Sequence, residues 1–411
     1  MLISETCRKA KESVGAIAFA DERAMNRMLE SAANALRSNA DYIISENVKD
    51  VNACTRGEQF IDRLSLSVSR IDAIAVGLEK LISLPCPVGE LLEERVLYNG
   101  LRLTKVRVPL GVVGIIYEAR PNVTADAVGL AIKSGNAIVL RGSKDAIHSN
   151  RAIVKVIKDA ITKSGYDSEF IQLIEDTTRE GATQFMRMKD CIDVLIPRGS
   201  AALINSAVQN ATIPVIETGT GNCHVYFEKS ADVSKGLPIL LNAKTQRTSV
   251  CNACESLLLD ESFAEAHLFE IVAALQNAGV EIAACDRCRA LMPQLPAATE
   301  EDFYTEYLGM KISVKVVKDV DEAISHINRC GTHHSDCIVT EDAAAAEKFL
   351  REVDSAAVYH NASTRFTDGF EFGLGAEMGI STQKLHARGP MGLRELTSYK
   401  YCIRGDGQIR G

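Results

Sequence analysis

The chain has 411 residues, of which 46% are hydrophobic and 24% are charged, and this composition predicts a folded protein of about two or three domains. Its formal net charge of −8 excludes the general basic surface that nucleic acid requires, so we expect no nucleic-acid partner. The N-terminal segment lacks the apolar stretch of a secretory signal, and no apolar run approaches the ~18 residues that cross a bilayer, which predicts a cytoplasmic protein without membrane contact.

Helical periodicity dominates the chain up to about residue 90, where apolar residues recur three or four positions apart over 25–36 and again over 71–82. Residues 94–108 then alternate around Asn99-Gly100, the dipeptide that best suits a two-residue type I′ turn, and predict a β-hairpin. Polar residues on one face of this hairpin indicate an arm or a sheet edge rather than a central strand.

From Pro109 onward, apolar strand-like runs alternate with helical ones. The predicted strands are residues 111–117, 136–142, 170–175, 191–197 and 213–219, followed by 256–260, 311–317 and 336–340. The predicted helices are residues 124–135, 145–165, 200–211, 264–279, 321–328 and 342–353. This alternation predicts an α/β fold with parallel sheets that carry helices on both faces, in two units that divide near residue 220.

Three loops follow the predicted strands of the first unit: residues 117–123, 140–144 and 196–200. Ligands of open parallel sheets bind at the carboxyl ends of strands, where helix N-termini direct amide groups at anions. All three loops carry charge or glycine where a cofactor could lie. None of them contains the GxGxxG fingerprint of ordinary dinucleotide-binding folds, so solvated turns remain the alternative.

The 12 cysteines, in a long chain without a recognisable signal segment, predict reduced thiols rather than a disulfide framework. Two CxxC pairs can bind zinc or act in redox exchange: Cys251 with Cys254, and Cys285 with Cys288. A whole strand and helix separate the pairs, which is longer than the insert of a zinc ribbon, so we expect no metal. A zinc-stabilised binding protein remains an alternative.

Cys251 differs from the other cysteines in its surroundings. Lys244 and Arg247 precede it, and the pattern predicts a transition from loop to helix at the cysteine. Nearby cations and helix amides favour the thiolate, which is the nucleophilic form of the side chain. Cys251 is therefore the candidate nucleophile.

Six stretches, in order along the chain, resemble the aldehyde dehydrogenase superfamily and, within it, the γ-glutamyl phosphate reductases. These stretches are residues 108–127, 130–153, 215–226, 242–258, 326–342 and 368–382. The resemblance implies an aldehyde-dehydrogenase-like α/β fold with two parallel-sheet domains. The cofactor-binding domain would comprise 1–93 and 109–219, the catalytic domain 220–384, and a β-hairpin oligomerisation arm 94–108 and 385–411. We therefore expect a homo-oligomer.

The resemblance also implies residue roles. Cys251 becomes the catalytic nucleophile, and Glu217 occupies the position where hydrolytic relatives keep a general base. Asn122 is the expected oxyanion donor, with helix capping as its alternative role. The implied cofactor-binding positions are Arg141, Ser143, Lys144, Gly199, Ser200 and Glu306. The expected cofactor is NADPH, because Lys144 stands where an acid commonly binds the adenosine ribose of NAD.

The activity implied by the resemblance is NADPH-dependent reduction of L-glutamyl 5-phosphate to L-glutamate 5-semialdehyde through a Cys251 thioester, the second step of proline biosynthesis. Arg120, Lys244 and Arg247 would bind the acyl phosphate, and Ser363 with Thr364 the far end of the substrate. A glutamate 5-kinase is a candidate partner. A hydrolytic aldehyde dehydrogenase, which uses the same cysteine, remains an alternative.

Overall fold

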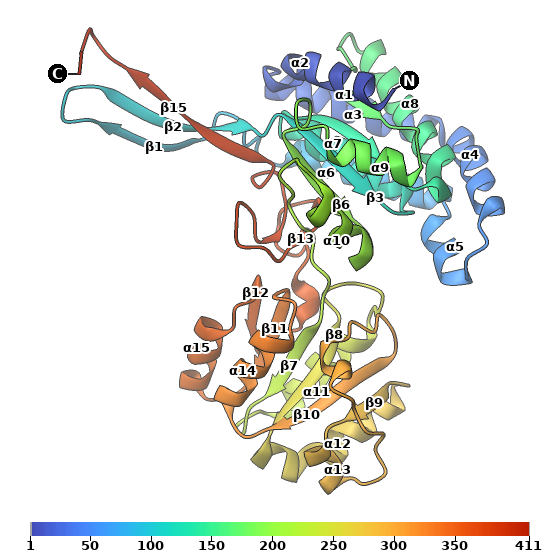
Figure 1. Cartoon of the computed structure of the whole chain (residues 1–411), viewed down its shortest axis with the longest axis vertical. Helices are drawn as coiled ribbons and strands as arrows, with labels where there is room; N and C mark the ends of the chain where they lie inside the picture. The colour runs from blue at the N-terminus through green and yellow to red at the C-terminus, as the bar shows by residue number, and fades with distance from the viewer. Residues whose placement is uncertain (1, 411) are drawn as a thin grey trace. The chain divides into compact units, whose positions relative to one another are not determined.

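The computed structural model describes residues 2–410, which fold into two compact units (Figure 1). The first unit contains the chain up to Glu217, with Gly373–Gly379 and the segment from Met391 onward. The second unit contains Thr218–Phe372 and Ile380–Pro390. The division after Glu217 lies close to the boundary near residue 220 expected from the sequence.

The N-terminal layer of the first unit is helical, as predicted. It comprises α1 (Ile3–Glu12), α2 (Val14–Ala18), α3 (Glu22–Ser38), α4 (Ala40–Ala53), α5 (Glu58–Leu64) and α6 (Val68–Ser83). The side chains at the predicted helical spacing in α3 and α6 are buried, among them Met28, Leu36 and Leu78. Asp21 caps α3 by accepting a hydrogen bond from the Ala24 N–H at 2.7 Å.

The first unit has a four-stranded parallel sheet in the order β5-β4-β3-β6. Its strands are β3 (Val112–Tyr117), β4 (Ala137–Arg141), β5 (Ile171–Leu173) and β6 (Val194–Arg198), and its helices are α7 (Pro121–Lys133), α8 (Ile147–Lys163), α9 (Arg179–Met186) and α10 (Ala201–Asn210). Every residue of β3 and β4 is buried, which explains their uninterrupted apolar sequences. The strand predicted at 213–219 is wrong, because only Val215 forms an isolated bridge, to Leu195. Pro214 has no N–H with which to continue a ladder.

The predicted hairpin is present, but its turn differs from the expected type I′. Strand β1 (Leu91–Val96) pairs with β2 (Arg102–Pro109), and β2 pairs with β15 (Thr397–Arg404) in one antiparallel sheet, hereafter the arm sheet (Figure 1). The Gly100 N–H donates to the Leu97 carbonyl (2.9 Å), and the Leu97 N–H donates to the Leu101 carbonyl (2.8 Å). Gly100 has φ of +85°, whereas Asn99 keeps a negative φ. The loop is therefore a three-residue turn that closes with a glycine bulge.

The second unit has a six-stranded parallel sheet in the order β12-β11-β7-β8-β10-β9. Its strands are β7 (Cys223–Phe227), β8 (Cys254–Asp260), β9 (Glu281–Ala284), β10 (Lys311–Val317), β11 (Ser335–Val339) and β12 (Ala357–His360). Its helices are α11 (Val233–Thr245), α12 (Glu261–Asn277), α13 (Asp286–Leu291), α14 (Val320–Cys330) and α15 (Ala343–Glu352). Separate apolar clusters pack on the sheet, one containing α12 and the other α14 with α15.

The sequence prediction differs from the second unit in several places. Strands β7, β9 and β12 and helix α11 were not predicted; α11 contains Pro238, which masks its helical pattern. Residues 385–390, assigned to the arm, belong to the second unit, where β13 (Ile380–Ser381) pairs with β14 (Gly389–Pro390). Among the described residues, no helix is both long and apolar enough to cross a membrane.

Candidate active site

Cys251 lies in a turn that leads directly into β8, at the amino end of that strand. The predicted transition from loop to helix is therefore wrong: α11 ends at Thr245, and the next regular element is a strand. No helix therefore begins at Cys251. The side chain is half-buried, whereas Cys254, three residues later, is fully buried.

The loop that carries Cys251 (residues 246–253, hereafter the nucleophile loop) is held from two sides. On one side, the Cys223 thiol donates to the Cys251 carbonyl at 3.1 Å. The backbone of Gly221 also touches this carbonyl, since a Cβ at position 221 would lie 1.4 Å from the Cys251 oxygen. On the other side, the Asn252 amide donates to the Thr367 carbonyl at 2.9 Å. These contacts fix the backbone position of Cys251.

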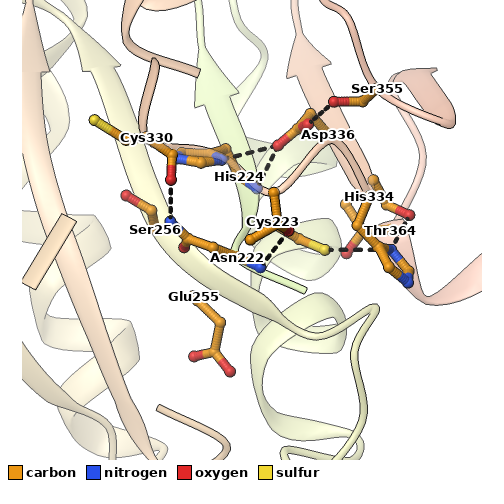
Figure 2. Close-up of polar contacts among 12 residues, drawn as sticks. Asn222, Cys223, His224, Glu255, Ser256, Cys330, His334, Asp336, Ser355 and Thr364 are labelled. Carbon is orange, nitrogen blue, oxygen red and sulfur yellow. Dashed lines mark hydrogen bonds and ion pairs between the residues drawn. The ribbon is translucent and has the colours of Figure 1, made fainter. Parts of the chain in front are cut away.

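Polar contacts link buried residues around the support Cys223, among them His334 (Figure 2). His334 Nδ1 lies 3.8 Å from Cys223 Sγ and 2.8 Å from Ser335 Oγ, and Ser335 donates to Thr367 Oγ1 at 2.7 Å. The chain of contacts thus leads from one support of the loop, Cys223, to the other, Thr367. Burial lowers the pKa of His334 to about 4, so its imidazole is neutral at pH 7.

Arg365 lies within electrostatic reach of both the Cys251 thiol and the Arg247 guanidinium. Arg365 is half-buried, and its Nε donates to Gln246 Oε1 of the nucleophile loop at 2.9 Å. Burial, and then the like charge of Arg247, lowers the pKa of Arg365, while Asp368 and Cys251 act in the opposite direction. Arg247 is exposed. A guanidinium group beside a thiol favours the thiolate, and two neighbouring guanidinium groups favour an anionic ligand.

The structure contradicts the predicted role of Lys244 as a phosphate ligand. Its side chain is fully buried and forms an ion pair with Glu255, which is also fully buried. Thr364 is fully buried as well, and its hydroxyl donates to the Asn252 carbonyl at 2.8 Å. Ser363 is 5% exposed, and its hydroxyl accepts from the Arg365 N–H. These residues support the nucleophile loop and are not arranged to bind substrate.

Glu306 lies beside the nucleophile loop. Its Oε1 accepts a hydrogen bond from the Gly221 N–H at 2.7 Å, and Gly221 in turn touches Cys251. Burial raises the pKa of this carboxyl. Asn222 fixes the same region, because its amide donates to the Phe303 and Cys330 carbonyls at 2.8 and 2.9 Å.

Asn122, Arg120 and Glu217 belong to the first unit. Asn122 is exposed in the first turn of α7, and its amide donates to Asp126 on the same helix at 3.1 Å. The residue at the N-cap of α7 is Arg120, so the capping alternative for Asn122 is wrong. Glu217 is half-buried at the end of the unit.

The cofactor positions predicted for the first unit meet at the carboxyl edge of its sheet. Arg141, at the end of β4, donates from Nη2 to the Thr178 carbonyl at 2.7 Å, while its Nε and the Ser143 hydroxyl are buried without a partner among the described residues. Lys144 is exposed at the start of the short helix η1 (Lys144–Ala146). Unsatisfied buried donors at this edge fit the acceptor groups of a dinucleotide.

A carboxylate of the protein already occupies the N-terminus of α10. Glu118 accepts from the Ser200 N–H at 3.1 Å and from its hydroxyl at 2.7 Å. A Cβ at Gly199 would lie 2.7 Å from the Glu118 carboxyl carbon. The predicted pyrophosphate position thus attracts an anion, but in this structure the anion is an internal one.

The zinc alternative finds no support in the arrangement of the cysteines. Over residues 2–410, no three or more histidine, cysteine, aspartate or glutamate side chains form a group that could hold a metal ion. Cys254 donates to the Ser256 carbonyl at 3.3 Å, while Cys285 and Cys288 contact each other. The four cysteines therefore do not form one site.

A sequence profile of the Aldehyde dehydrogenase family matches residues 2–287 and 298–401. The γ-glutamyl phosphate reductase of Clostridium perfringens is 53% identical over 406 residues, which cover 98% of both chains. The chain belongs to the γ-glutamyl phosphate reductases of this family. The γ-glutamyl phosphate reductase of Shouchella clausii is similarly 52% identical over 98% of both chains.

Solved structures agree with this assignment to the γ-glutamyl phosphate reductases. The crystal structure of γ-glutamyl phosphate reductase from Thermotoga maritima matches with a TM-score of 0.98 and 45% identity, over 100% of both chains. An acetylating aldehyde dehydrogenase from Geobacillus thermoglucosidasius matches with a TM-score of 0.73 at 18% identity, over 100% of this chain and 97% of that one. At that identity the likeness shows the shared aldehyde dehydrogenase fold alone.

Sequence reasoning about this aldehyde dehydrogenase missed Arg365 and Cys223, and it gave His334 a structural role without relating it to Cys251. Arg365 directly follows the Ser363-Thr364 pair that was considered, so its charge was an available signal. Cys223 begins β7 and His334 precedes β11, and no local pattern relates either residue to Cys251. Only the order of the strands brings them behind the nucleophile loop.

The buried neutral state of His334 predicts acid sensitivity of this reductase. In the unfolded chain this histidine binds a proton below pH ~6.5, whereas in the folded protein it does so only near pH 4. Its contribution to the free energy of unfolding is therefore complete above pH ~6.5 and is lost as the pH falls from there toward 4. Between pH 7 and 5 we expect the wild type to lose about 2 kcal/mol of unfolding free energy through this group. His334→Gln should lose correspondingly less in urea titrations at both pH values.

Exposed His386 provides the control for this measurement. It has φ of +69°, so His386→Asn is the variant that its backbone tolerates best, and it should follow the wild-type pH dependence. If His334→Gln loses as much stability as the wild type between pH 7 and 5, the pKa of this histidine does not differ between the folded and unfolded states.

Proposed function

We propose that the chain reduces L-glutamyl 5-phosphate with NADPH to L-glutamate 5-semialdehyde and phosphate, the second step of proline biosynthesis from glutamate, in the cytoplasm. The identity of 53% over 98% of both chains to a γ-glutamyl phosphate reductase carries this proposal. The half-buried Cys251 on its rigid loop supports it, because acyl transfer to a thiol requires an accessible nucleophile in a fixed position.

In the first step, the Cys251 thiolate attacks the acyl carbon of the substrate. The carbon–sulfur bond forms and the bond from the acyl carbon to the phosphate oxygen breaks. Phosphate departs, and the acyl group remains as a thioester on Cys251. Arg247 and Arg365 bind the phosphate dianion and stabilise the thiolate before attack. The Cys251 N–H and Asn122 are the proposed donors to the oxyanion, and Arg120 is a further proposed cation at the phosphate.

Residues of the first unit would hold the adenosine and pyrophosphate parts of the cofactor. Arg141 Nε and the Ser143 hydroxyl donate to the adenosine end, and Ser200 with Gly199 receives the pyrophosphate. Glu306, which belongs to the second unit, would hold the nicotinamide ribose. When bound, the reduced nicotinamide supplies the hydride that converts the thioester to a thiohemiacetal. The Cys251 sulfur then leaves as a thiolate, and the aldehyde is released.

The hydrolytic alternative differs only in the fate of the thioester. In that reaction Glu217 would act as a general base and activate a water molecule that hydrolyses the thioester. The reverse reaction separates the two activities. L-glutamate 5-semialdehyde and NADP are supplied with and without inorganic phosphate, and product is trapped with hydroxylamine. The proposal requires NADP reduction that depends on phosphate and yields an acyl hydroxamate. Phosphate-independent oxidation to glutamate would establish the hydrolytic enzyme instead.

The proposed preference for NADPH rests on Lys144. This exposed cation attracts the 2′-phosphate. Arg141 is less available to bind that phosphate, because its Nη2 already donates a hydrogen bond to the Thr178 carbonyl. Solvent screening limits the gain to about 1.4 kcal/mol, or roughly tenfold in kcat/KM. Lys144→Glu should reverse the preference, as measured by kcat/KM for both cofactors. A variant with the original ratio would assign the selectivity to other residues.

The internal carboxylate at α10 predicts a competition with the cofactor. Glu118→Gln keeps a side chain that can bond to Ser200 but removes the charge at the helix N-terminus. Because the pyrophosphate then displaces an amide rather than an anion, KM for NADPH should fall by roughly fivefold to tenfold. An increased KM would mean that Glu118 helps to bind the cofactor.

We also propose that the arm sheet joins copies of this chain in a homo-oligomer. Its strands present exposed apolar side chains, including Val96, Tyr399 and Ile403. Contiguous exposed apolar groups on an edge sheet favour association. A glutamate 5-kinase remains the proposed partner that supplies the labile acyl phosphate.

A further inference from the structure

The CDRC pair, Cys285 and Cys288, has no part in the proposed reaction. Cys285 follows β9 and caps α13, at the carboxyl edge of the parallel sheet (Figure 1). Cys251 precedes β8, at the amino edge of the same sheet. The pair and the nucleophile therefore lie at opposite ends of the strands.

We propose that Cys285 and Cys288 form a redox-active dithiol, which low-molecular-weight disulfides oxidise reversibly to an intramolecular disulfide. The two sulfurs lie 3.5 Å apart. Cys285 is half-buried and reachable from solvent, while Cys288 is fully buried behind it. An accessible attacking thiol with a buried resolving partner is the arrangement that thiol–disulfide exchange requires.

The surroundings of Cys285 stabilise its thiolate. Besides the contact with Cys288, its sulfur accepts the backbone N–H of Val316 at 3.3 Å and that of Cys288 at 3.5 Å. The contact with the Cys288 thiol is the largest of the effects that lower the pKa of Cys285, against burial, which raises it. The same contact and burial raise the pKa of Cys288, so the two thiols have distinct roles.

The buried cysteines Cys254 and Cys337 lack this arrangement. Burial raises the pKa values of Cys254 and Cys337 to about 12, and each sulfur contacts a backbone carbonyl rather than another thiol. A simple packing role would favour a neutral buried thiol of this kind. The backbone donors on Cys285 instead favour an anion at that sulfur.

The exchange proceeds in two balanced steps. The Cys285 thiolate attacks one sulfur of a disulfide RSSR, a mixed disulfide forms, and RS⁻ leaves. Cys288 loses its proton to solvent and attacks the Cys285 sulfur, which releases the second RS⁻. Two electrons pass from the dithiol to RSSR, and two molecules of RSH result. A thiol reductant reverses both steps.

The test uses the full-length protein with oxidised glutathione as the probe, followed by alkylation of free thiols, trypsin digestion and mass spectrometry. Arg287 lies between the two cysteines, so trypsin places Cys288 on the peptide 288–289 and Cys285 on the peptide 248–287, which also carries Cys251 and Cys254. Fragment ions that show Cys251 and Cys254 alkylated then assign the joined peptides to the disulfide between Cys285 and Cys288. We expect the joined peptides to become the main form and to be lost on addition of dithiothreitol. Cys254 and Cys337 should stay alkylated throughout.

Variants of the pair distinguish exchange from nonspecific oxidation. Cys288→Ser should stop at a glutathione adduct on Cys285, while Cys285→Ser should leave Cys288 free. Cys251→Ala should form the joined peptides as the wild type does, which makes the result independent of the proposed catalysis. The proposal is overturned if both cysteines stay reduced in the wild type, if the adduct persists there unresolved, or if Cys285 pairs with a different cysteine.

Discussion

Replacement of Cys251 by alanine should reduce turnover by at least about a thousandfold while leaving the unfolding midpoint close to that of the wild type. The large loss is expected because no other described side chain beside the nucleophile loop can form a thioester; the sulfur of Cys223 is fully buried and donates to the Cys251 carbonyl. The thiol of Cys251 is half-buried and makes a small contribution to packing. Steady-state rates and urea titrations of the same preparation check both parts.

Cys254→Ala is the matched control, because this cysteine belongs to the same CNAC motif but is buried in the apolar cluster that contains α12. Its loss should cost stability, as the removal of a fully buried side chain does, and should preserve most of the activity. If the two variants are equally inactive and equally stable, Cys251 is not the specific nucleophile of the reaction.

The second large effect concerns stability and involves the buried pair of Lys244 and Glu255. Lys244→Met should destabilise the protein by roughly 3 to 5 kcal/mol, because it leaves the Glu255 carboxylate buried without its counterion. The double variant Lys244→Met/Glu255→Gln removes both charges, and its amide can still accept the Leu308 N–H that now bonds to Glu255. We expect it to recover most of the lost stability in urea titrations.

The double variant also distinguishes the structural role of Lys244 from the substrate-binding role that its sequence position suggests. A structural ion pair predicts that KM for L-glutamyl 5-phosphate stays near the wild-type value once stability is restored. A stable double variant with a greatly raised KM would restore Lys244 as a phosphate ligand.

The elements of the fold could be predicted where local sequence determines them. Buried parallel strands such as β3 and β4 need apolar residues on both faces, so their runs stand out from the helices around them. Helix α11 was not predicted because Pro238 interrupts its helical pattern, although the surrounding packing tolerates the proline. The turn at Asn99-Gly100 was assigned to the wrong type because strand register, rather than the dipeptide alone, selects the loop length.

The candidate site could be predicted only in part. Cys251 was singled out by two neighbouring cations, yet one of them, Lys244, points into the core and pairs with Glu255. Nearness along the chain is therefore a poor guide to which charge faces a thiol. Arg365 approaches from a distant segment, and its contribution depends on how the sheet is ordered. Local composition carries little information about that order.

The pairing of β2 with β15 has a consequence for synthesis on the ribosome. Arg102 is paired with Arg404, so the arm sheet cannot close until almost the entire chain has emerged. The second unit, by contrast, is nearly continuous from Thr218 to Phe372 and requires only the short segment Ile380–Pro390 to complete it. During translation, the free edge of β2 in the β1–β2 hairpin therefore stays unpaired while the second unit folds. In this interval the nascent chain is most exposed to pairing of that edge with a wrong strand.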